Sequence, residues 1–344
     1  MWKPKTRFCL SAAVFGVLAI GSGAQAADEL VIATFGGSFG DATEKCHIAP
    51  FEEETGAEVI MTLGSSVDNA AKIRATAGNP EIDLAYMDIE IAKQMEAEGL
   101  LESLDFESLE NYDGVDPNVF NEDGHFANFM TSATVIAYNP DEVDSPPTSW
   151  SDLFDPKYEG KIALGDITGT SGLHFLLAVN RMKDGDFESQ DAGFEAIEDL
   201  MPHVVTLYTQ ADQLVELFQR GEIVMAPWYP DRAGSAADKG VNVAVSYPEE
   251  GAVGIRPTVS VPEGAANKDL ALQYMDVLFS KEGQECFAEN MYAAPVRMDV
   301  DLSEKVQAVL PSSEDYEKLW YPDTDVTSEL RPEWTQRWQR EIAN

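Results

Sequence analysis

The sequence predicts an α/β fold, because short apolar runs with strand character alternate with helical segments along the chain. The runs are LVIAT, AEVIMTL, IDLAYM, SATVIAY, KIALG, HVVTLY, EIVMAPW and VNVAVSY. About 318 residues follow the N-terminal segment described next, which is long for one hydrophobic core and indicates two domains. We expect sheets that are covered by helices on both faces.

The N-terminus predicts a secretory signal peptide over residues 1–26. Three basic residues within the first seven precede the apolar run FCLSAAVFGVLAIG, and Ala24-Gln25-Ala26 supplies a cleavage site. No later stretch approaches the roughly 20 apolar residues of a membrane helix. We therefore expect an exported and soluble mature protein.

Capping residues predict where helices begin after the strands. Ser66 precedes VDNAAKIRATAG, Asp88 precedes IEIAKQMEAEG, and Thr209 with Asp212 forms a capping box before LVELFQRG. In α/β sheets ligands bind beyond the carboxyl ends of the strands, where such helices start. The loops at these positions are therefore the candidate site.

These strand-end loops are rich in glycine, small hydroxyls and aromatic rings. Such residues let backbone amides approach a small polar ligand and then wall it off from water. No metal or cofactor is expected, because the four histidines lack metal-binding spacing. The candidate ligand-binding residues are Phe35, Gly36, Gly37, Ser38, Phe39, Ser66, Asp88, Thr170, Ser171, Trp228, Asp231 and Arg232.

The segment GGSFG around Ser38 also fits the G-x-S-x-G pattern of a hydrolase nucleophile elbow. Here the pattern follows the first strand after the signal peptide, no HGGG-like segment exists, and no spacing singles out Asp166 and His174 as partners. A ligand-holding turn is the favoured interpretation. An exported serine hydrolase that uses Ser38 stays as the alternative.

Composition excludes one class of partner. Once the three basic residues of the signal peptide are removed, 61 acidic residues face 20 basic ones. Nucleic acid is excluded, because binding phosphates requires basic patches. We interpret the acidity as a solvated surface that keeps an exported protein soluble.

Four segments resemble the solute-binding proteins of bacterial ABC importers, in the group that includes spermidine/putrescine receptors. They are FEEETGAEVI, PPTSWSDLFDPKYEGKIAL, FQRGEIVMAPW and SVPEGAANKDLALQYMDVLFSKEGQECFAENMYAAPV. The resemblance implies a two-lobed periplasmic binding protein fold of type II, each lobe a mainly parallel sheet covered by helices. It also implies a monomer that holds one small-molecule solute in the cleft, without a cofactor, and delivers it to an inner-membrane ABC permease.

Under this resemblance we expect the chain to cross between lobes near residues 133–138 and 255–259. Lobe 1 would combine residues 28–132 with about 259–300, and lobe 2 about 139–254 with about 301–344. These crossings return Cys286 to the lobe of Cys46, which predicts a disulfide between them. Two free buried thiols are the alternative.

The resemblance also bears on the solute. Polyamine receptors hold methylenes between aromatic rings and fix each ammonium with a carboxylate. Trp228 and Tyr292 match their aromatic positions, but Arg256 stands where they place an aspartate before SVP, and the turn DITGTSG replaces an acidic pair. The solute is therefore a polyamine, or an amino acid, opine or aminophosphonate with an anionic end.

Two arginines and two aspartates are the candidates for binding the ends of such a solute. Arg232 and Arg256 would clamp an anion, or else form surface salt bridges. Asp88 and Asp231 would hold an ammonium, although Asp88 is also suited to act only as a helix cap.

Overall fold

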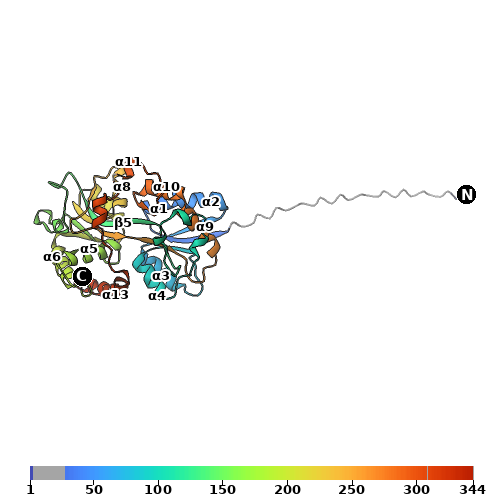
Figure 1. Ribbon diagram of the computed structural model, residues 1–344, viewed down its shortest axis with the longest axis horizontal. Helices are drawn as coiled ribbons and strands as arrows, with labels where there is room; N and C mark the ends of the chain where they lie inside the picture. Colours follow the sequence, from blue (N-terminus) through green and yellow to red (C-terminus); the bar gives the residue numbers. More distant parts are fainter. Residues whose placement is uncertain (3–27, 308, 344) are drawn as a thin grey trace.

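The computed structural model describes residues 1–2, 28–307 and 309–343, so most of the predicted signal peptide lies outside the described residues. The described chain forms two lobes side by side, each built on its own β-sheet (Figure 1). Within the described residues, no helix is both long enough and apolar enough to cross a membrane.

Lobe 1 is the half built on the first sheet, whose strand order is β2-β1-β3-β11-β4. Strands β1, β2 and β3 run parallel, and β11 pairs antiparallel with both β3 and β4. The strands are β1 (Glu29–Thr34), β2 (Glu58–Leu63), β3 (Leu84–Asp88), β4 (Ala127–Asn128) and β11 (Pro257–Ser260).

Lobe 2 is the half built on the second sheet, ordered β10-β5-β8-β6-β7, with β9 and β12 also paired to β5. Here β6 is parallel to β7 and β8, and β5 is antiparallel to all its neighbours. The strands are β5 (Met130–Tyr138), β6 (Ile162–Gly165), β7 (Val204–Tyr208), β8 (Met225–Trp228), β9 (Ala244–Ser246), β10 (Val253–Ile255) and β12 (Ala294–Pro295).

Both sheets are mixed, which corrects the expectation of mainly parallel sheets. The reason is the way the chain passes between the lobes: it leaves the first sheet after β4, enters the second as β5, and returns from β10 to β11. The strands next to these passages, β5 and β11, run against their neighbours. Phe129 and Arg256 stand at the two crossing points.

The helices of lobe 1 pack on a core that joins the first sheet to the C-terminal part of that lobe. A disulfide between Cys46 and Cys286, 240 residues apart, ties the first helical segment to α10, as predicted. The helices are α1 (Ser38–Thr43), the π-helical η1 (Glu44–Ile48), α2 (Ala49–Thr55), α3 (Ser66–Ala75), α4 (Ile89–Ala97), α9 (Lys268–Phe279) and α10 (Lys281–Met291). Their core includes Leu30, Phe51, Tyr86, Phe129, Tyr274, Phe279 and Phe287.

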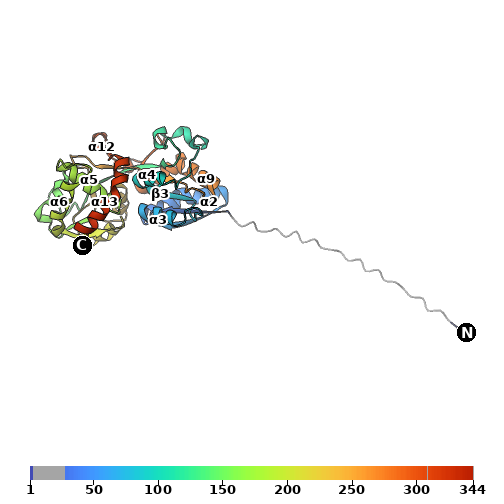
Figure 2. The same ribbon diagram turned by 90° about the horizontal axis from the view of Figure 1, so that it is seen from below.

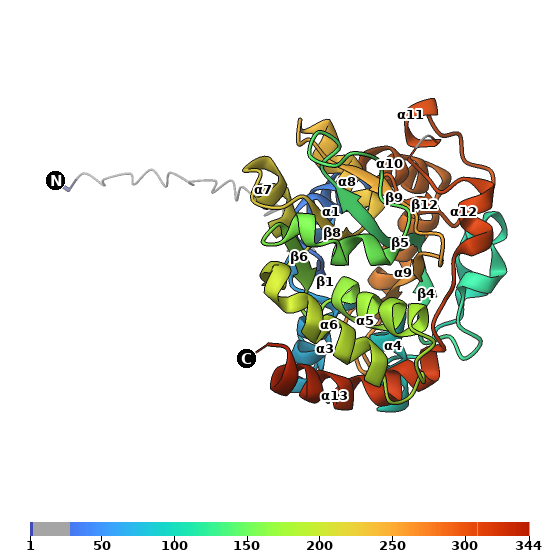
Figure 3. The ribbon, with the colours of Figure 1, turned by 90° about the vertical axis from the view of Figure 1, so that its left-hand side faces the viewer.

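The helices of lobe 2 cover the second sheet, and α13 lies along the base of this lobe beside α5 and α6 (Figure 3). Trp334 and Trp338 of α13 are buried in the lobe 2 core. The helices are α5 (Thr170–Met182), α6 (Asp191–Leu200), α7 (Gln213–Gln219), α8 (Pro230–Asp238), α11 (Glu304–Gln307), α12 (Ser313–Lys318) and α13 (Thr324–Glu341). Short 3-10 turns cover Phe106–Ser108, Tyr112–Gly114, Pro117–Val119, Trp150–Phe154, Pro156–Tyr158 and Met201–His203.

The predicted helix caps need three corrections. The cap of α3 is Ser65 rather than Ser66, because Ser65 forms the capping box with Asp68. Asp212 precedes α7 but makes no side-chain cap, since its carboxylate reaches across to the other lobe. Asp88 does precede α4, yet its side chain does not cap that helix either.

Candidate functional site

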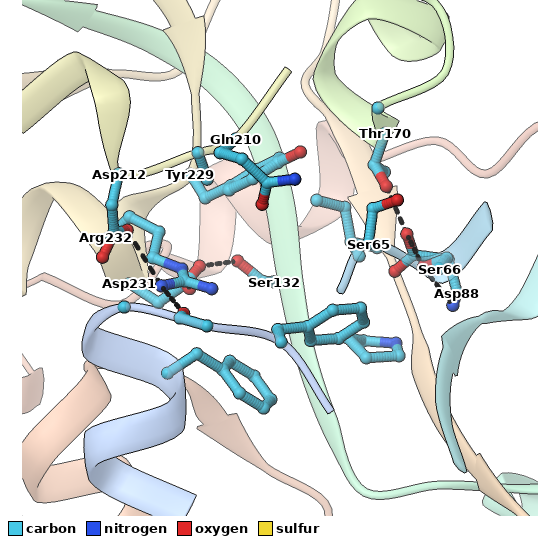
Figure 4. Close-up of a pocket in the computed structure, with 18 of the residues that line it drawn as sticks. Ser65, Ser66, Asp88, Ser132, Thr170, Gln210, Asp212, Tyr229, Asp231 and Arg232 are labelled. Carbon is cyan, nitrogen blue, oxygen red and sulfur yellow. Dashed lines mark hydrogen bonds and ion pairs between the residues drawn. The ribbon is translucent and has the colours of Figure 1, made fainter. Parts of the chain in front are cut away.

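A cavity of about 300 Å³ lies between the two lobes at the ends of their strands. Figure 4 shows that side chains from both lobes and from the crossing strand β5 point into it. Lobe 1 contributes Phe35, Gly36, Gly37, Phe39, Gly64, Ser65, Ser66 and Asp88; lobe 2 contributes Thr168, Gly169, Thr170, Thr209, Gln210, Ala211, Asp212, Tyr229, Asp231 and Arg232; the crossing strands contribute Met130, Ser132, Ile255 and Pro257.

One end of the cavity is built around Asp88, which sits where β3 passes into α4. Its Oδ2 accepts a hydrogen bond of 2.9 Å from Ser66 Oγ and another from Thr170 Oγ1. Thr170 opens α5, so the second bond joins the lobes. Within the described chain, no ion pair reaches Asp88, and these bonds leave Oδ1 unused. We call these three residues the Asp88 end.

The opposite end is built around Arg232 on α8. Its Nη1 donates to Asp212 Oδ1 at 2.9 Å, to Gly36 O at 3.1 Å and to Ser38 Oγ at 3.1 Å. The other oxygen of Asp212 accepts from the Ser38 amide at 2.8 Å. These bonds also join the lobes, and we call Arg232, Asp212, Gly36 and Ser38 the Arg232 end.

Asp231 lies next to the Arg232 end and is buried. Its Oδ1 accepts from Ser132 Oγ at 2.5 Å, and its Oδ2 lies 4.0 Å from Arg232 Nε. Burial raises the pKa of the Asp231 carboxyl, and the neighbouring Arg232 charge opposes that rise.

Aromatic rings form the apolar part of the wall. Phe35 and Phe39 pack edge to face at 5.0 Å, and the Arg232 guanidinium lies 5.4 Å from the centre of the Phe39 ring. The Tyr229 hydroxyl accepts from the Ser171 amide at 2.9 Å. Burial raises the pKa of Tyr229 to about 12, so this wall carries a neutral phenol at neutral pH.

Many of the sequence-predicted residues come together here. Ser38 contacts Arg232 at the edge of the wall, and Ser171 lies behind the wall, where its Oγ accepts from Tyr208 at 2.7 Å. The predicted residues that line the cavity are Phe35, Gly36, Gly37, Phe39, Ser66, Asp88, Thr170, Asp231 and Arg232.

Three predicted residues lie elsewhere. Trp228 is 0% exposed and stacks on Phe218 in the core, while the next residue, Tyr229, faces the cavity, because successive strand residues point to opposite faces. The Arg256 guanidinium lies 4.6 Å from the centre of the Tyr321 ring, outside the lining. The Tyr292 hydroxyl donates to Asp238, also outside it.

Sequence reasoning missed Asp212, Gln210, Ser132, Ser65 and Tyr229 as cavity residues. Asp212 was assigned only to a helix start, and Ser132 lies in a strand that was treated as a connection between lobes. Ser65 and Tyr229 stand next to predicted site residues in the strand-end loops but were not chosen. Their position on strand-end loops or crossing strands is the signal that could have included them.

The Ser38 hydroxyl accepts a hydrogen bond from a guanidinium, which stays protonated and therefore cannot remove its proton. Among the residues that the structure describes, no cluster of three or more His, Cys, Asp or Glu side chains could hold a metal ion. The site thus has the features of a binding cavity.

The comparisons with known proteins agree with the interpretation of the site as a binding cavity. A family model described as bacterial extracellular solute-binding protein matches residues 47–310. The chain is 25% identical over 256 residues to the spermidine/putrescine-binding periplasmic protein of Escherichia coli K12, covering 71% of this chain and 72% of that one. It is also 25% identical over 194 residues to a Salmonella typhimurium protein named for 2-aminoethylphosphonate binding, covering 55% and 56%.

Among solved structures, the periplasmic binding protein AgtB of A. tumefaciens R10, in complex with agropinic acid, superposes with a TM-score of 0.79. It covers 92% of this chain and 99% of its own, at 23% identity, and so shows the shared fold. The fold expected from the sequence is therefore confirmed.

Proposed function

We propose that this chain, which belongs to the bacterial extracellular solute-binding protein family, captures a small amine-containing solute between its lobes for an ABC importer. Proteins of this family are transport receptors rather than enzymes, which overturns the serine hydrolase alternative. The observation that carries the proposal is the Asp88 end, where a buried carboxylate has one oxygen that no described residue binds.

The charges of the wall favour an amine. The lining holds three carboxylates, Asp88, Asp212 and Asp231, against the single guanidinium of Arg232. Arg232 is already paired with Asp212, so the unpaired negative charge lies chiefly at Asp88. A charge-assisted hydrogen bond from an ammonium to Asp88 would use that charge.

The Arg232 end bears on the choice between the two solute types that the sequence leaves open. The Arg232 guanidinium points toward the middle of the cavity (Figure 4), and within the described chain its Nη2 donates no hydrogen bond. This favours a solute that carries a carboxylate or phosphonate as well as an amine. A plain diamine is the second candidate, supported by the excess of carboxylates and the aromatic wall.

Export and delivery belong to the same proposal. The signal peptide over residues 1–26 would direct the protein to the periplasm and would then be cleaved. There the protein would act as a monomer with an inner-membrane permease. The proposed lobes, residues 28–132 with about 259–300 and about 139–254 with about 301–344, would close on the solute. Identical scattering profiles with and without a bound solute would contradict closure.

A thermal-shift screen tests the solute class. Putrescine and 4-aminobutyrate form a matched pair, since both present an amine on a four-carbon chain and differ at the other end. A solute that binds only the folded state raises the melting temperature by mass action. We expect a larger shift with 4-aminobutyrate, and we would include other amino acids, opines, phosphonates and spermidine. A shift only with sugars or with anions that lack an amine would refute the proposal.

A further inference from the structure

Helix α13 connects the two lobes on the side of the molecule away from α8 and α10. Its last turns are held in lobe 2, where Trp334 Nε1 donates to Glu188 O at 2.9 Å and Trp338 is fully buried. Its first turns lie beside α4 of lobe 1 (Figure 2). There Gln94 Nε2 donates to Ser328 O at 2.6 Å and Lys93 Nζ lies 3.8 Å from Asp325 Oδ1.

Between these two attachments, Arg331 turns inward from α13. Its side chain is only 4% exposed, which is unusual for an arginine. The guanidinium donates to Thr168 O at 3.0 Å and to Ile167 O at 3.4 Å. Both carbonyls belong to the Asp166–Thr170 loop that connects β6 to α5.

This loop forms part of the cavity wall. Thr168, Gly169 and Thr170 line the cavity, and the Thr170 hydroxyl reaches across to Asp88. Both bonds come from Nη2, and a buried donor held between two consecutive carbonyls restrains the direction of the loop backbone, because the planar guanidinium is a rigid group. Arg331 thus stands directly behind the contact that joins the lobes at the Asp88 end.

The charge of Arg331 also acts on the Asp88 end. Burial and the Asp88 charge raise the pKa of the buried Glu90 carboxyl in the first turn of α4, and Arg331 and Arg256 oppose that rise. Burial, together with the Arg331 charge, lowers the pKa of His174 to about 3. The charged groups around Glu90 are therefore Asp88, Arg256 and Arg331.

We infer that Arg331 is a positioning residue for solute capture, which ties the C-terminal helix to the Asp166–Thr170 loop and supports the negative charge at the Asp88 end. The inference rests on the proposed function, since it names a residue that supports the wall of the same site from behind. It accounts for the burial of an arginine that does not line the cavity.

The test compares Arg331→Met, which keeps the unbranched stem but removes the charge, with Arg331→Lys, which keeps the charge but loses the fork. Arg337→Met is the matched control, because Arg337 lies on the same helix and pairs at the surface with Asp191 and Glu341. Calorimetric titration would use putrescine and 4-aminobutyrate. We expect about tenfold weaker binding for Arg331→Met, about threefold for Arg331→Lys and little change for Arg337→Met.

The pH dependence of binding separates positioning from a merely structural role. Without Arg331, Glu90 takes up its proton at a higher pH, so the negative charge of Glu90 next to Asp88 is lost earlier as the pH falls and the Asp88 end attracts an ammonium less. The pH below which affinity drops should therefore rise in Arg331→Met and stay in place in Arg331→Lys. Equal pH profiles in wild type and Arg331→Met would overturn the electrostatic part.

Hydrogen exchange of the solute-free protein tests the positioning part independently of any solute. Amides of residues 166–172 should exchange faster in both Arg331 variants than in wild type or Arg337→Met. If neither probe binds wild type, the proposed solute class fails, while the exchange result still decides the role of Arg331. If Arg331→Met does not fold, the positioning role is tested with Arg331→Lys alone. Exchange rates in Arg331→Lys equal to those of wild type would refute the inference.

Discussion

The two ends of the cavity close across the lobes by different means. At the Arg232 end an arginine and an aspartate of lobe 2 bind the Gly36 carbonyl, the Ser38 hydroxyl and the Ser38 amide of lobe 1. At the Asp88 end a single neutral hydroxyl, that of Thr170, reaches the carboxylate of lobe 1.

The difference indicates how the cavity divides its tasks. Charges at the Arg232 end compensate each other within the protein, so that end closes the lobes whether or not a charged group binds there. The carboxylate at the Asp88 end lacks an ion-pair partner among the described residues, so a bound cation would contribute most there. We therefore expect recognition of the amine at the Asp88 end, and discrimination between solutes at the Arg232 end.

Replacing Asp88 should have the largest effect on binding. Asp88→Asn keeps the shape and an oxygen acceptor for Ser66 and Thr170 but removes the charge. Loss of the ammonium partner in a closed cavity should cost on the order of 2 to 5 kcal/mol, or at least ~30-fold in affinity. Calorimetry with putrescine and 4-aminobutyrate would measure it, with the exposed Glu58→Gln as control. Unchanged affinity would mean that the amine is bound elsewhere.

Replacing Arg232 should distinguish the solute types. Arg232→Gln removes contacts that help to close the lobes on either solute. It should nevertheless weaken 4-aminobutyrate binding by about 2 kcal/mol, or ~30-fold, more than putrescine binding, because a cation near an ammonium is repulsive. Arg256→Gln is the matched control, since that guanidinium lies over Tyr321 outside the cavity. Tight putrescine binding with no response of 4-aminobutyrate to Arg232→Gln would restore the plain polyamine interpretation.

Two adjacent glycines allow closure at the Arg232 end to be tested by itself. Gly37 has a φ of +66°, and an added Cβ would lie 1.8 Å from Asp212 Oδ2, whereas a Cβ at Gly36 would have its nearest contact at 3.7 Å from Leu63. Gly37→Ala should destabilise the fold by roughly 1–2 kcal/mol and weaken solute binding about tenfold. Gly36→Ala should leave the stability of the fold unchanged, because its Cβ meets only ordinary contacts. Chemical denaturation would compare the stability of the two variants, and calorimetry their solute binding. Equal behaviour of the two variants would show that the Asp212 contact is unimportant.

Removal of the Thr170 hydroxyl should have the smallest effect. Thr170→Val deletes one hydrogen bond between the lobes at the Asp88 end, which is worth about 1 kcal/mol, or ~5-fold in affinity. Thr55→Val is the control, because its hydroxyl bonds only within lobe 1, to Phe51 O at 2.7 Å. A loss as large as that of Asp88→Asn would show that the lobes depend on this contact for closure.

The sequence predicted the fold and nine of the residues that line the cavity, because strand ends in an α/β fold collect on one edge, and residue type at those ends is readable. The prediction of cavity residues failed where neighbouring residues point to opposite faces of a strand. Trp228 and Tyr229 are adjacent in the chain, and only the second faces the cavity, since side chains alternate along a strand.

The same limit applies to Arg256 and to Asp212. Arg256 lies between Ile255 and Pro257, which both line the cavity while its own guanidinium does not. Asp212 has the residue type of a helix cap, and only the packing of the lobes brings its carboxylate to the Ser38 amide. Such contacts between distant segments are not encoded in local patterns.

The double passage of the chain between lobes has a consequence for biosynthesis. Lobe 1 lacks β11, α9 and α10 until residue 291 is made, and lobe 2 lacks the buried Trp334 and Trp338 until α13 is made. A nascent chain that ends after β10 therefore has neither core complete. At 5–20 residues per second, the wait from residue 255 to residue 338 lasts roughly 4 to 17 s. During those seconds apolar surface of both lobes stays exposed, so the growing chain depends on protection against aggregation.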